Sequence, residues 1–360
     1  MKGPHSAVVT AGTPEGVTND PLARTASGSI RTRLVRTTLV FGGLAAVVCL
    51  TAPLIGTTHI SFARVFDRSI PFADNVDAQI FFIARLPRVL AAALVGAALA
   101  AAGVVFQALL RNPLAPPFTL GVSSGASLGA MLAITFVSSL TLGPLSPVPL
   151  ASLAGAGIAA FIVDSLARAT DRAISTSVLL LAGVTLNSFF SALILFVQYL
   201  ADFAQVFSAF RWLMGDLDVG GFQPILASLP LVIISFVLFA RLPAALNLLS
   251  LGADSAAGRG VDVPRVQRLA FISGSLATSA AVSLAGPIGF IGIVVPHLVR
   301  LMVGVDHRLV LPASALFGAS FLVVCDVLAR VVLAPVEIPV GVVTAMIGGP
   351  FFLWLLVRRG

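Results

Sequence analysis

Long apolar stretches separated by short polar connectors make up most of the 360-residue chain. Because the hydrocarbon core of a bilayer is about 30 Å thick, an apolar stretch of about 20 residues predicts a membrane-spanning helix. The apolar and polar positions do not alternate, which favours helices over the strands of a membrane barrel. We predict ten spanning helices, at residues 34–55, 83–109, 117–138, 147–168, 176–200, 223–241, 266–285, 289–303, 309–333 and 340–357.

The amino-acid composition also indicates a membrane protein. Hydrophobic residues make up 58% of the chain and charged residues 10%, whereas a soluble domain carries about 25% charged residues. We therefore expect an all-α, polytopic membrane protein with one transmembrane domain over residues 34–360. Residues 1–33 are polar and rich in Gly, Ser, Thr and Pro, so we expect them to form a disordered tail.

The distribution of charge supports ten spans and predicts their orientation. With the N-terminus in the cytoplasm, sixteen of the 22 Lys and Arg residues but only seven of the 15 Asp and Glu residues fall on the cytoplasmic side. Membrane proteins concentrate Lys and Arg in their cytoplasmic loops. The pattern predicts that both termini are cytoplasmic, and it accounts for the formal net charge of +7 without a nucleic-acid partner.

Several kinds of chemistry are excluded by residue usage. Lys2 is the only lysine, and a Walker A loop needs a lysine to reach the nucleotide phosphates. We therefore expect no ATP hydrolysis by this chain alone and no enzyme activity. The two cysteines lie in apolar stretches and the four histidines are scattered, so we expect neither a metal site nor a cofactor.

Charged residues at the predicted outer ends of the spans are candidates for function, because a charge near the membrane is costly unless it has a partner or a function. Arg85 and Arg88 begin the second span, and Arg330 ends the ninth, four residues after Asp326. Two structural interpretations are an i,i+4 ion pair of Arg330 with Asp326 and snorkelling of Arg85 and Arg88 to headgroups. The functional interpretation is that the guanidinium groups receive carboxylates from an external partner.

Two connecting segments have patterns of their own. Residues 250–262 are too polar to span a membrane and too few to form a domain. They are either a solvated connector or a short docking helix. Between residues 201 and 215, Phe203, Phe207 and Phe210 fall on one helical face, which predicts an amphipathic helix at the outer surface.

Small residues and one recurring pattern bear on how the helices pack. Gly121, Gly125 and Gly129 form two overlapping GxxxG steps, which let helix backbones approach closely in lipid. Pro87-Arg88-Val89 opens the second span, and Pro264-Arg265-Val266 opens the seventh. These two spans are predicted to run in opposite directions, as in the inverted repeats of transporters.

A series of short motifs follows in order along the chain. The first half contains Arg85-Leu86-Pro87-Arg88, Gly96-Ala97-Ala98-Leu99, Gln107, Arg111-Asn112-Pro113-Leu114-Ala115 and Gly121-Val122-Ser123-Ser124-Gly125-Ala126. The second half contains Leu180-Leu181-Ala182-Gly183, Trp212-Leu213-Met214-Gly215, Ala285-Gly286-Pro287-Ile288-Gly289-Phe290-Ile291-Gly292, Pro296-His297, Arg300, Asp306-His307-Arg308 and Pro339-Val340-Gly341-Val342-Val343-Thr344. Over roughly residues 34–358 the sequence resembles the FecCD-type permeases of type II ABC importers, which serve iron-siderophore complexes, haem and vitamin B12.

The resemblance implies an inverted-repeat bundle of ten transmembrane helices and assigns roles to particular residues. Arg85 and Arg330 match arginines that receive glutamates of an external binding protein. The ATPase-coupling loop matches Leu251, Gly252, Ala253, Asp254, Ser255, Ala256, Ala257 and Gly258, with Ala253 where the family usually has an acidic residue. The cytoplasmic gate and pathway match Asn112, Leu114, Ser175, Thr176 and Ser177.

The resemblance also implies partners and a location. The partners are a dimer of ATP-binding subunits on the cytoplasmic side, an extracytoplasmic substrate-binding protein and a second permease subunit, in a homodimer or a heterodimer. The location is the bacterial cytoplasmic (inner) membrane, in contact with lipid. The expected cargo is a metal chelate, foremost a ferric siderophore, with haem and cobalamin as alternatives. The sequence shows no ligand cluster that would handle a bare metal ion.

Two other classes of protein make different predictions. An ion-coupled secondary transporter needs ionisable residues at mid-membrane for its coupling ion. The predicted spans are almost bare of them, and the nearest candidate, Asp326, lies toward a span end. An intramembrane enzyme would need a cluster of His, Asp or Glu at membrane depth, and the sequence shows none.

Overall fold

A computed structural model of the chain describes residues 21–137, 146–170 and 176–359, and all regular secondary structure within these ranges is helical. The α-helices are α1 (Pro21–Thr51), α2 (Phe62–Val65), α3 (Val76–Gln79), α4 (Leu86–Leu109), α5 (Val122–Phe136), α6 (Pro147–Thr170), α7 (Thr176–Leu200), α8 (Phe203–Leu213), α9 (Gln223–Phe239), α10 (Pro243–Leu249), α11 (Ala253–Ala257), α12 (Val263–Ala285), α13 (Ile291–Val303), α14 (His307–Val331) and α15 (Val340–Arg359). Three short helical turns, η1 (Ala52–Leu54), η2 (Ile80–Arg85) and η3 (Pro117–Leu120), join them.

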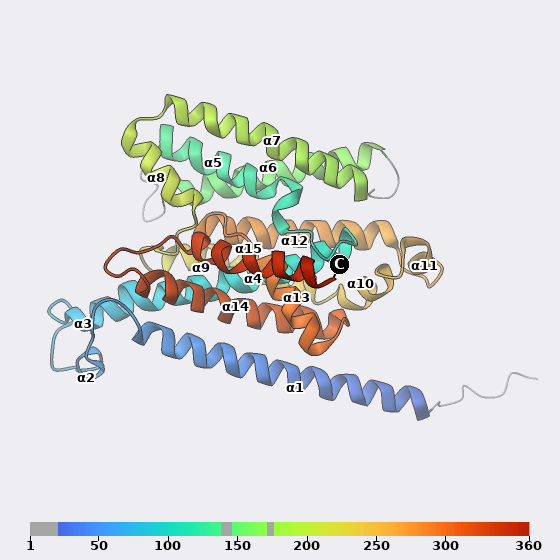
Figure 1. The fold of residues 1–360 in the computed structure, drawn as a ribbon, viewed down its shortest axis with the longest axis horizontal. Coiled ribbons are helices and arrows are strands. Elements are labelled where there is room, and N and C mark those ends of the chain that lie inside the picture. The colour runs from blue at the N-terminus through green and yellow to red at the C-terminus, as the bar shows by residue number, and fades with distance from the viewer. Residues whose placement is uncertain (1–20, 138–145, 171–175, 360) are drawn as a thin grey trace, which may run out of the picture.

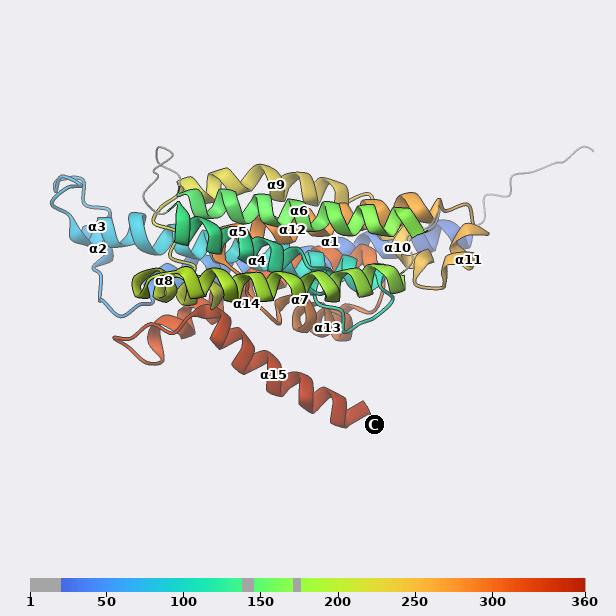
Figure 2. The same ribbon diagram turned by 90° about the horizontal axis from the view of Figure 1, so that it is seen from above.

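The long helices lie side by side around a buried α4 (Figure 1). Helices α12, α13 and α14 pack against α4, whereas α5, α6 and α7 form a layer on one side and α1 covers α14 on the other. One end of the bundle carries α2, α3 and α8, and we call it the α3 end. The other carries α10, α11 and the start of α1, and we call it the α11 end (Figures 1 and 2).

The ten predicted spans correspond in order to α1, α4, α5, α6, α7, α9, α12, α13, α14 and α15. Six helices are long and apolar enough to cross a membrane alone, and the pair α9 and α10, bent by 58°, forms a seventh span if the pair is counted as one. The other three, α5, α13 and α15, are shorter apolar helices. The eighth span is short: α13 begins only at Ile291, ends at Val303, and contains both Gly292 and Pro296.

The first helix begins earlier than the sequence pattern predicts. Helix α1 starts at Pro21, so residues 21–33, which we expected in a disordered tail, are helical here. Proline is favoured in the first turn of a helix because its missing N–H is not needed there. No further proline interrupts the segment before Pro53. Residues 1–20 lie outside the described ranges.

Glycines allow the helices around α4 and α5 to approach closely. A Cβ atom added at Gly96 would lie 2.2 Å from the carbonyl oxygen of Gly318 on α14, and one added at Gly103 would lie 2.1 Å from that of Gly292 on α13. The predicted close packing at Gly125 and Gly129 is confirmed, since both face α6. Gly121 has another use: its φ of 77° places it in the left-handed region at the N-cap of α5.

Two further sequence predictions agree with the fold. Helix α4 runs from the α3 end to the α11 end, and α12 runs beside it in the opposite direction (Figure 1). This is the antiparallel relation predicted for the two repeated motifs. The amphipathic helix forms as α8, which Asp202 caps together with Gln205. Its Phe203, Phe207 and Phe210 side chains are exposed.

Candidate sites at the two ends of the bundle

Arg85 and Arg330 meet under one short segment at the α3 end. From η2, Arg85 donates hydrogen bonds through Nη1 to the Pro53 carbonyl at 3.1 Å and through Nη2 to the Thr58 carbonyl. From α14, Arg330 donates through Nη1 to the Ile55 carbonyl at 3.0 Å. The two residues are only 6% and 5% exposed. The segment between Pro53 and Thr58 folds over both guanidinium groups, so Arg85 does not snorkel to headgroups, which was one interpretation of the sequence.

A buried carboxylate links two helices, α4 and α14, beside these arginines. Asp326 on α14 is fully buried and lies 2.7 Å from Arg88 Nε and 3.1 Å from Arg330 Nε. The i,i+4 pair with Arg330 is therefore confirmed. Arg88 also contacts Glu337, in the connection before α15, at 2.7 Å, so it pairs with acidic side chains and does not snorkel. The pairs neutralise charge that would be costly in the membrane.

The predicted coupling loop forms a small helix at the α11 end. Gly252, with a φ of 115°, turns the chain after α10, and α11 follows. Ala256 is buried against the bundle, whereas Asp254, Ser255 and Ala257 are exposed. Leu251 is 59% exposed. Of the two interpretations of residues 250–262, the structure thus favours a short helix with an outward face.

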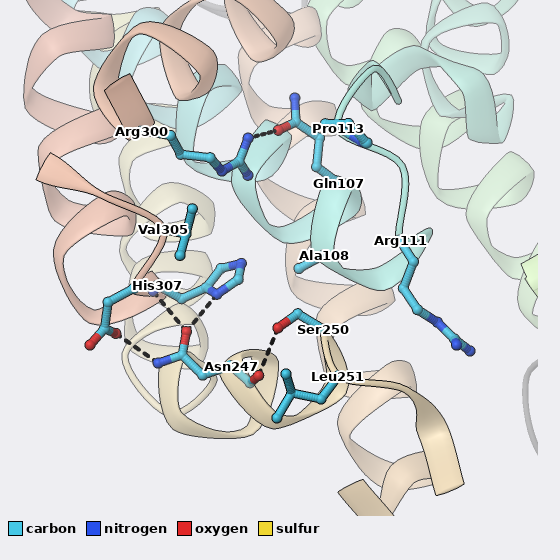
Figure 3. Close-up of a pocket in the computed structure, with 11 residues that line it drawn as sticks. Gln107, Ala108, Arg111, Pro113, Asn247, Ser250, Leu251, Arg300, Val305 and His307 are labelled. Atoms are coloured by element: carbon cyan, nitrogen blue, oxygen red, sulfur yellow. Dashed lines mark hydrogen bonds between the residues drawn. The ribbon is translucent and has the colours of Figure 1, made fainter. Parts of the chain in front are cut away.

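A cavity of about 530 Å³ opens beside this loop (Figure 3). It lies between the last turn of α4, α10, the end of α13 and the start of α14. Its lining residues are Gln107, Ala108, Arg111, Pro113, Asn247, Ser250, Leu251, Arg300, Val305, Asp306 and His307. The cavity therefore joins the predicted coupling loop to the central helix of the bundle.

Hydrogen bonds order the polar side chains of this cavity (Figure 3). Arg300 Nη1 donates to Gln107 Oε1 at 2.5 Å, and Gln107 Nε2 donates to the Gly292 carbonyl at 2.9 Å. Asn247 Nδ2 donates to Asp306 Oδ1 at 2.7 Å, and Asn247 Oδ1 accepts from the His307 amide at 2.9 Å. Gln107, Arg300, Asp306 and His307 each belong to a motif of the sequence, but Asn247 does not.

The predicted gate residues lie at the same end as the cavity. Asn112 and Leu114 follow α4 and are exposed, and Asn112 Oδ1 accepts from the Leu114 amide at 2.9 Å in a local turn. Thr176 and Ser177 begin α7, and Ser175 lies outside the described ranges. Farther along, η3 packs against α7. The segment with Asn112 and Leu114 leads into η3, and Thr176 and Ser177 begin α7, so the two predicted gate segments lead into elements that contact each other.

The described helices and polar ends define a multi-pass, all-α membrane protein. Its chain belongs to the FecCD transport family, whose model matches residues 44–358.

Individual relatives support the membership. The chain is 36% identical over 346 residues to the hemin transport system permease protein HmuU of Yersinia pestis, covering 92% of this chain and 98% of that one. It is 44% identical over 275 residues to the cobalamin import system permease protein BtuC of Halobacterium salinarum, covering 76% and 72%. These relatives are transport permeases.

A solved structure shows the same fold. It is an inward-facing conformation of a metal-chelate type ABC transporter, with a TM-score of 0.77, 31% identity, and coverage of 90% of this chain and 99% of that one. The bundle is therefore that of a type II ABC importer permease, as the sequence motifs predicted.

Proposed function

We propose that this chain is the permease subunit of an ABC importer whose cargo is a ferric siderophore. The coarser assignment, a permease for a metal chelate, is supported by the solved metal-chelate transporter and by the haem and cobalamin permeases among the relatives. The narrower choice of cargo rests on the chemistry of one cavity.

That cavity, of about 510 Å³, lies between α5, α7 and α8; its surface is mainly apolar, and its polar side chains are all uncharged. Its polar lining residues are Ser123, Ser124, Ser127, Asn187, Ser191 and Gln198. Hydroxyl and amide groups suit the hydrogen-bonding exterior of a siderophore, whose chelating groups already fill the coordination sphere of iron. Haem carries carboxylates, for which this cavity offers no cation.

The described residues support chelate transport in a second way. Among them, no group of three or more His, Cys, Asp or Glu side chains could hold a metal ion. A bare ion would need such oxygen, nitrogen or sulfur ligands along its path. A chelated ion brings its own ligands.

The partners follow from the two ends of the bundle. We place the ATP-hydrolysing subunits at the α11 end, which is then cytoplasmic, and the binding protein at the α3 end. Arg330 Nη2 is buried and has no hydrogen-bond partner among the described residues, so a carboxylate of the binding protein can pair with it once the segment from Pro53 to Thr58 moves aside. Exposed apolar residues on α15, which leaves the bundle (Figure 2), suit a second permease subunit.

Reconstituted transport tests this function. The permease is incorporated into proteoliposomes with its ATPase and binding protein, and uptake of a ⁵⁵Fe-labelled siderophore, haem and cobalamin is measured with and without ATP. We expect ATP-dependent uptake of the ferric siderophore. ATP-dependent uptake of haem or cobalamin alone would contradict the cargo, and uptake driven by an ion gradient without ATP would contradict the class.

A further inference from the structure

The cavity at the α11 end contains a cation without an acidic partner among the described residues. Arg300 is partly buried, and its guanidinium group donates a hydrogen bond to the neutral amide of Gln107. Within the described ranges, no carboxylate lies at ion-pair distance from Arg300. Asp306, the acidic residue of the lining, accepts instead from Asn247 and from the Arg308 amide.

This arrangement favours an anion in the cavity. A guanidinium group has five N–H donors, and removing a charge from water without a counter-charge is costly. Arg111 also lines the cavity and is exposed, although its guanidinium group points away from Arg300 (Figure 3). A carboxylate fits best, because it can accept two parallel hydrogen bonds from one guanidinium group.

The position of the cavity identifies the source of the anion. Ser250 and Leu251 line it and continue directly into α11. A protein that docks on the loop from Leu251 to Gly258 therefore covers the mouth of the cavity. We propose that an acidic side chain of the ATP-hydrolysing subunit enters this cavity and pairs with Arg300. This inference rests on the proposed function and adds a specific contact to it.

The contact would reach the core of the permease. Arg300 is bonded to Gln107, and Gln107 is bonded to the Gly292 carbonyl. Gly292 in turn packs against Gly103 where α13 crosses α4. Arg300 is thus two hydrogen bonds from a close helix crossing in the bundle centre.

Affinity measurements on the full-length permease test the proposal. Wild type, Arg300→Gln, Arg300→Glu and Gln107→Leu are placed in nanodiscs of zwitterionic lipid, and the Kd of the purified ATPase is measured for each. The control is Arg308→Glu, an exposed arginine at the same end that does not line the cavity. Monodispersity and melting temperature confirm that each variant is folded.

We expect Arg300→Gln to weaken ATPase binding about tenfold or more, since it leaves a partner charge unpaired, and Arg300→Glu to weaken it further. Gln107→Leu removes the same internal hydrogen bond but keeps the charge, so its loss of affinity should be smaller than that of Arg300→Gln, and Arg308→Glu should bind the ATPase as wild type does. Equal losses for Arg300→Gln and Gln107→Leu would overturn the proposal, because they would reveal a merely structural bond. Unchanged affinity of folded Arg300 variants would overturn it as well.

Two further measurements complete the test. Discs with anionic lipid distinguish a lipid phosphate from a carboxylate of the ATPase as the partner of Arg300. Replacement of the 252–258 loop distinguishes loss of the Arg300 contact from loss of ATPase docking as a whole. If the effect of Arg300→Gln appears only in discs that contain anionic lipid, the cavity holds a lipid phosphate and the proposal fails. If wild type binds no ATPase at all, the proposed function itself fails. If wild type binds, and replacing the 252–258 loop abolishes binding while Arg300→Gln does not, only the Arg300 contact fails.

Discussion

Arg88 on α4 and Asp326 on α14 form an ion pair 2.7 Å long at the α3 end, although 238 positions separate them in the sequence. The same carboxylate contacts Arg330. One fully buried carboxylate therefore pairs with two arginines and connects the central helix to its neighbour. Breaking a buried pair leaves an uncompensated charge, which costs more than the pair itself contributes.

Asp326→Asn should therefore destabilise the folded permease strongly, by about 3 to 5 kcal/mol. Glu337→Gln is the matched control, because Glu337 contacts the same Arg88 but its side chain is 47% exposed; we expect a cost of about 1 kcal/mol or less there. Thermal unfolding in detergent, followed by size-exclusion chromatography, measures both. Equal melting temperatures for the two variants would refute a structural role for the buried pair.

The sequence predicted only part of this cluster. The Asp326–Arg330 pair follows from their spacing on one helix, which is local information. The Arg88–Asp326 pair depends on α4 packing against α14, which spacing cannot reveal. Burial of Arg85 and Arg330 was missed for a similar reason: the sequence places both at span ends, but only the fold shows the segment from Pro53 to Thr58 lying over them.

The positions of the spans were predictable because hydrophobicity alone determines which segments enter lipid. Their ends were less so, as the early start of α1 at Pro21 shows. At the α11 end, the sequence indicated the short helix but not the cavity beside it. The cavity depends on Asn247, Arg300 and His307 meeting from three separate helices.

The glycine at the α4–α13 crossing gives a prediction about packing. Gly103→Ala should lower stability by about 1 to 3 kcal/mol, since the new methyl group would overlap the Gly292 carbonyl and force the helices apart. Gly157→Ala on α6 is the control, because a Cβ atom there meets no atom within 4 Å. Melting temperatures of the two variants measure the difference. A Gly103→Ala variant as stable as Gly157→Ala would show that the crossing adjusts without cost.

The loop that contains α11 should couple the permease to ATP hydrolysis. Replacing residues Gly252 to Gly258 with a Gly/Ser linker of equal length removes the helix and the buried Ala256 anchor. We expect loss of ATPase co-purification and of ATP-dependent transport. The control replaces residues 218–221 at the opposite end, where co-purification should persist. If the linker variant retains both activities, the docking assignment is wrong.

The start of α7 should move when the path opens toward the α11 end. A cysteine at Thr176, in a dimer with the native Cys49 and Cys325 replaced by alanine, should crosslink between subunits more in one nucleotide state than in another. Small hydroxyl residues at a helix end can pack closely when shut and accept water when open. Gel electrophoresis after oxidation, with ADP, ATP and an ATP analogue, measures the yield. The same yield in every state would exclude this gate.

The last prediction concerns Arg85 and Arg330, which we propose as the contact for the binding protein. Replacing both with glutamine should weaken binding of that protein about tenfold, equivalent to about 1.4 kcal/mol, because a neutral amide cannot attract its carboxylates. Arg68→Gln is the control, since Arg68 is exposed in the same outer loop region and should leave affinity unchanged.

Salt distinguishes direct pairing from an indirect effect of the Pro53–Thr58 segment. Salt weakens the attraction between opposite charges on two proteins, so a direct contact predicts that the difference in affinity between wild type and the double glutamine variant narrows at high ionic strength. If the arginines only hold the segment in place through the carbonyls of Pro53, Ile55 and Thr58, the gap should persist at every salt concentration. Binding assays on the purified complex from low to high salt measure this, and unchanged affinity in the folded double variant would place the docking surface elsewhere.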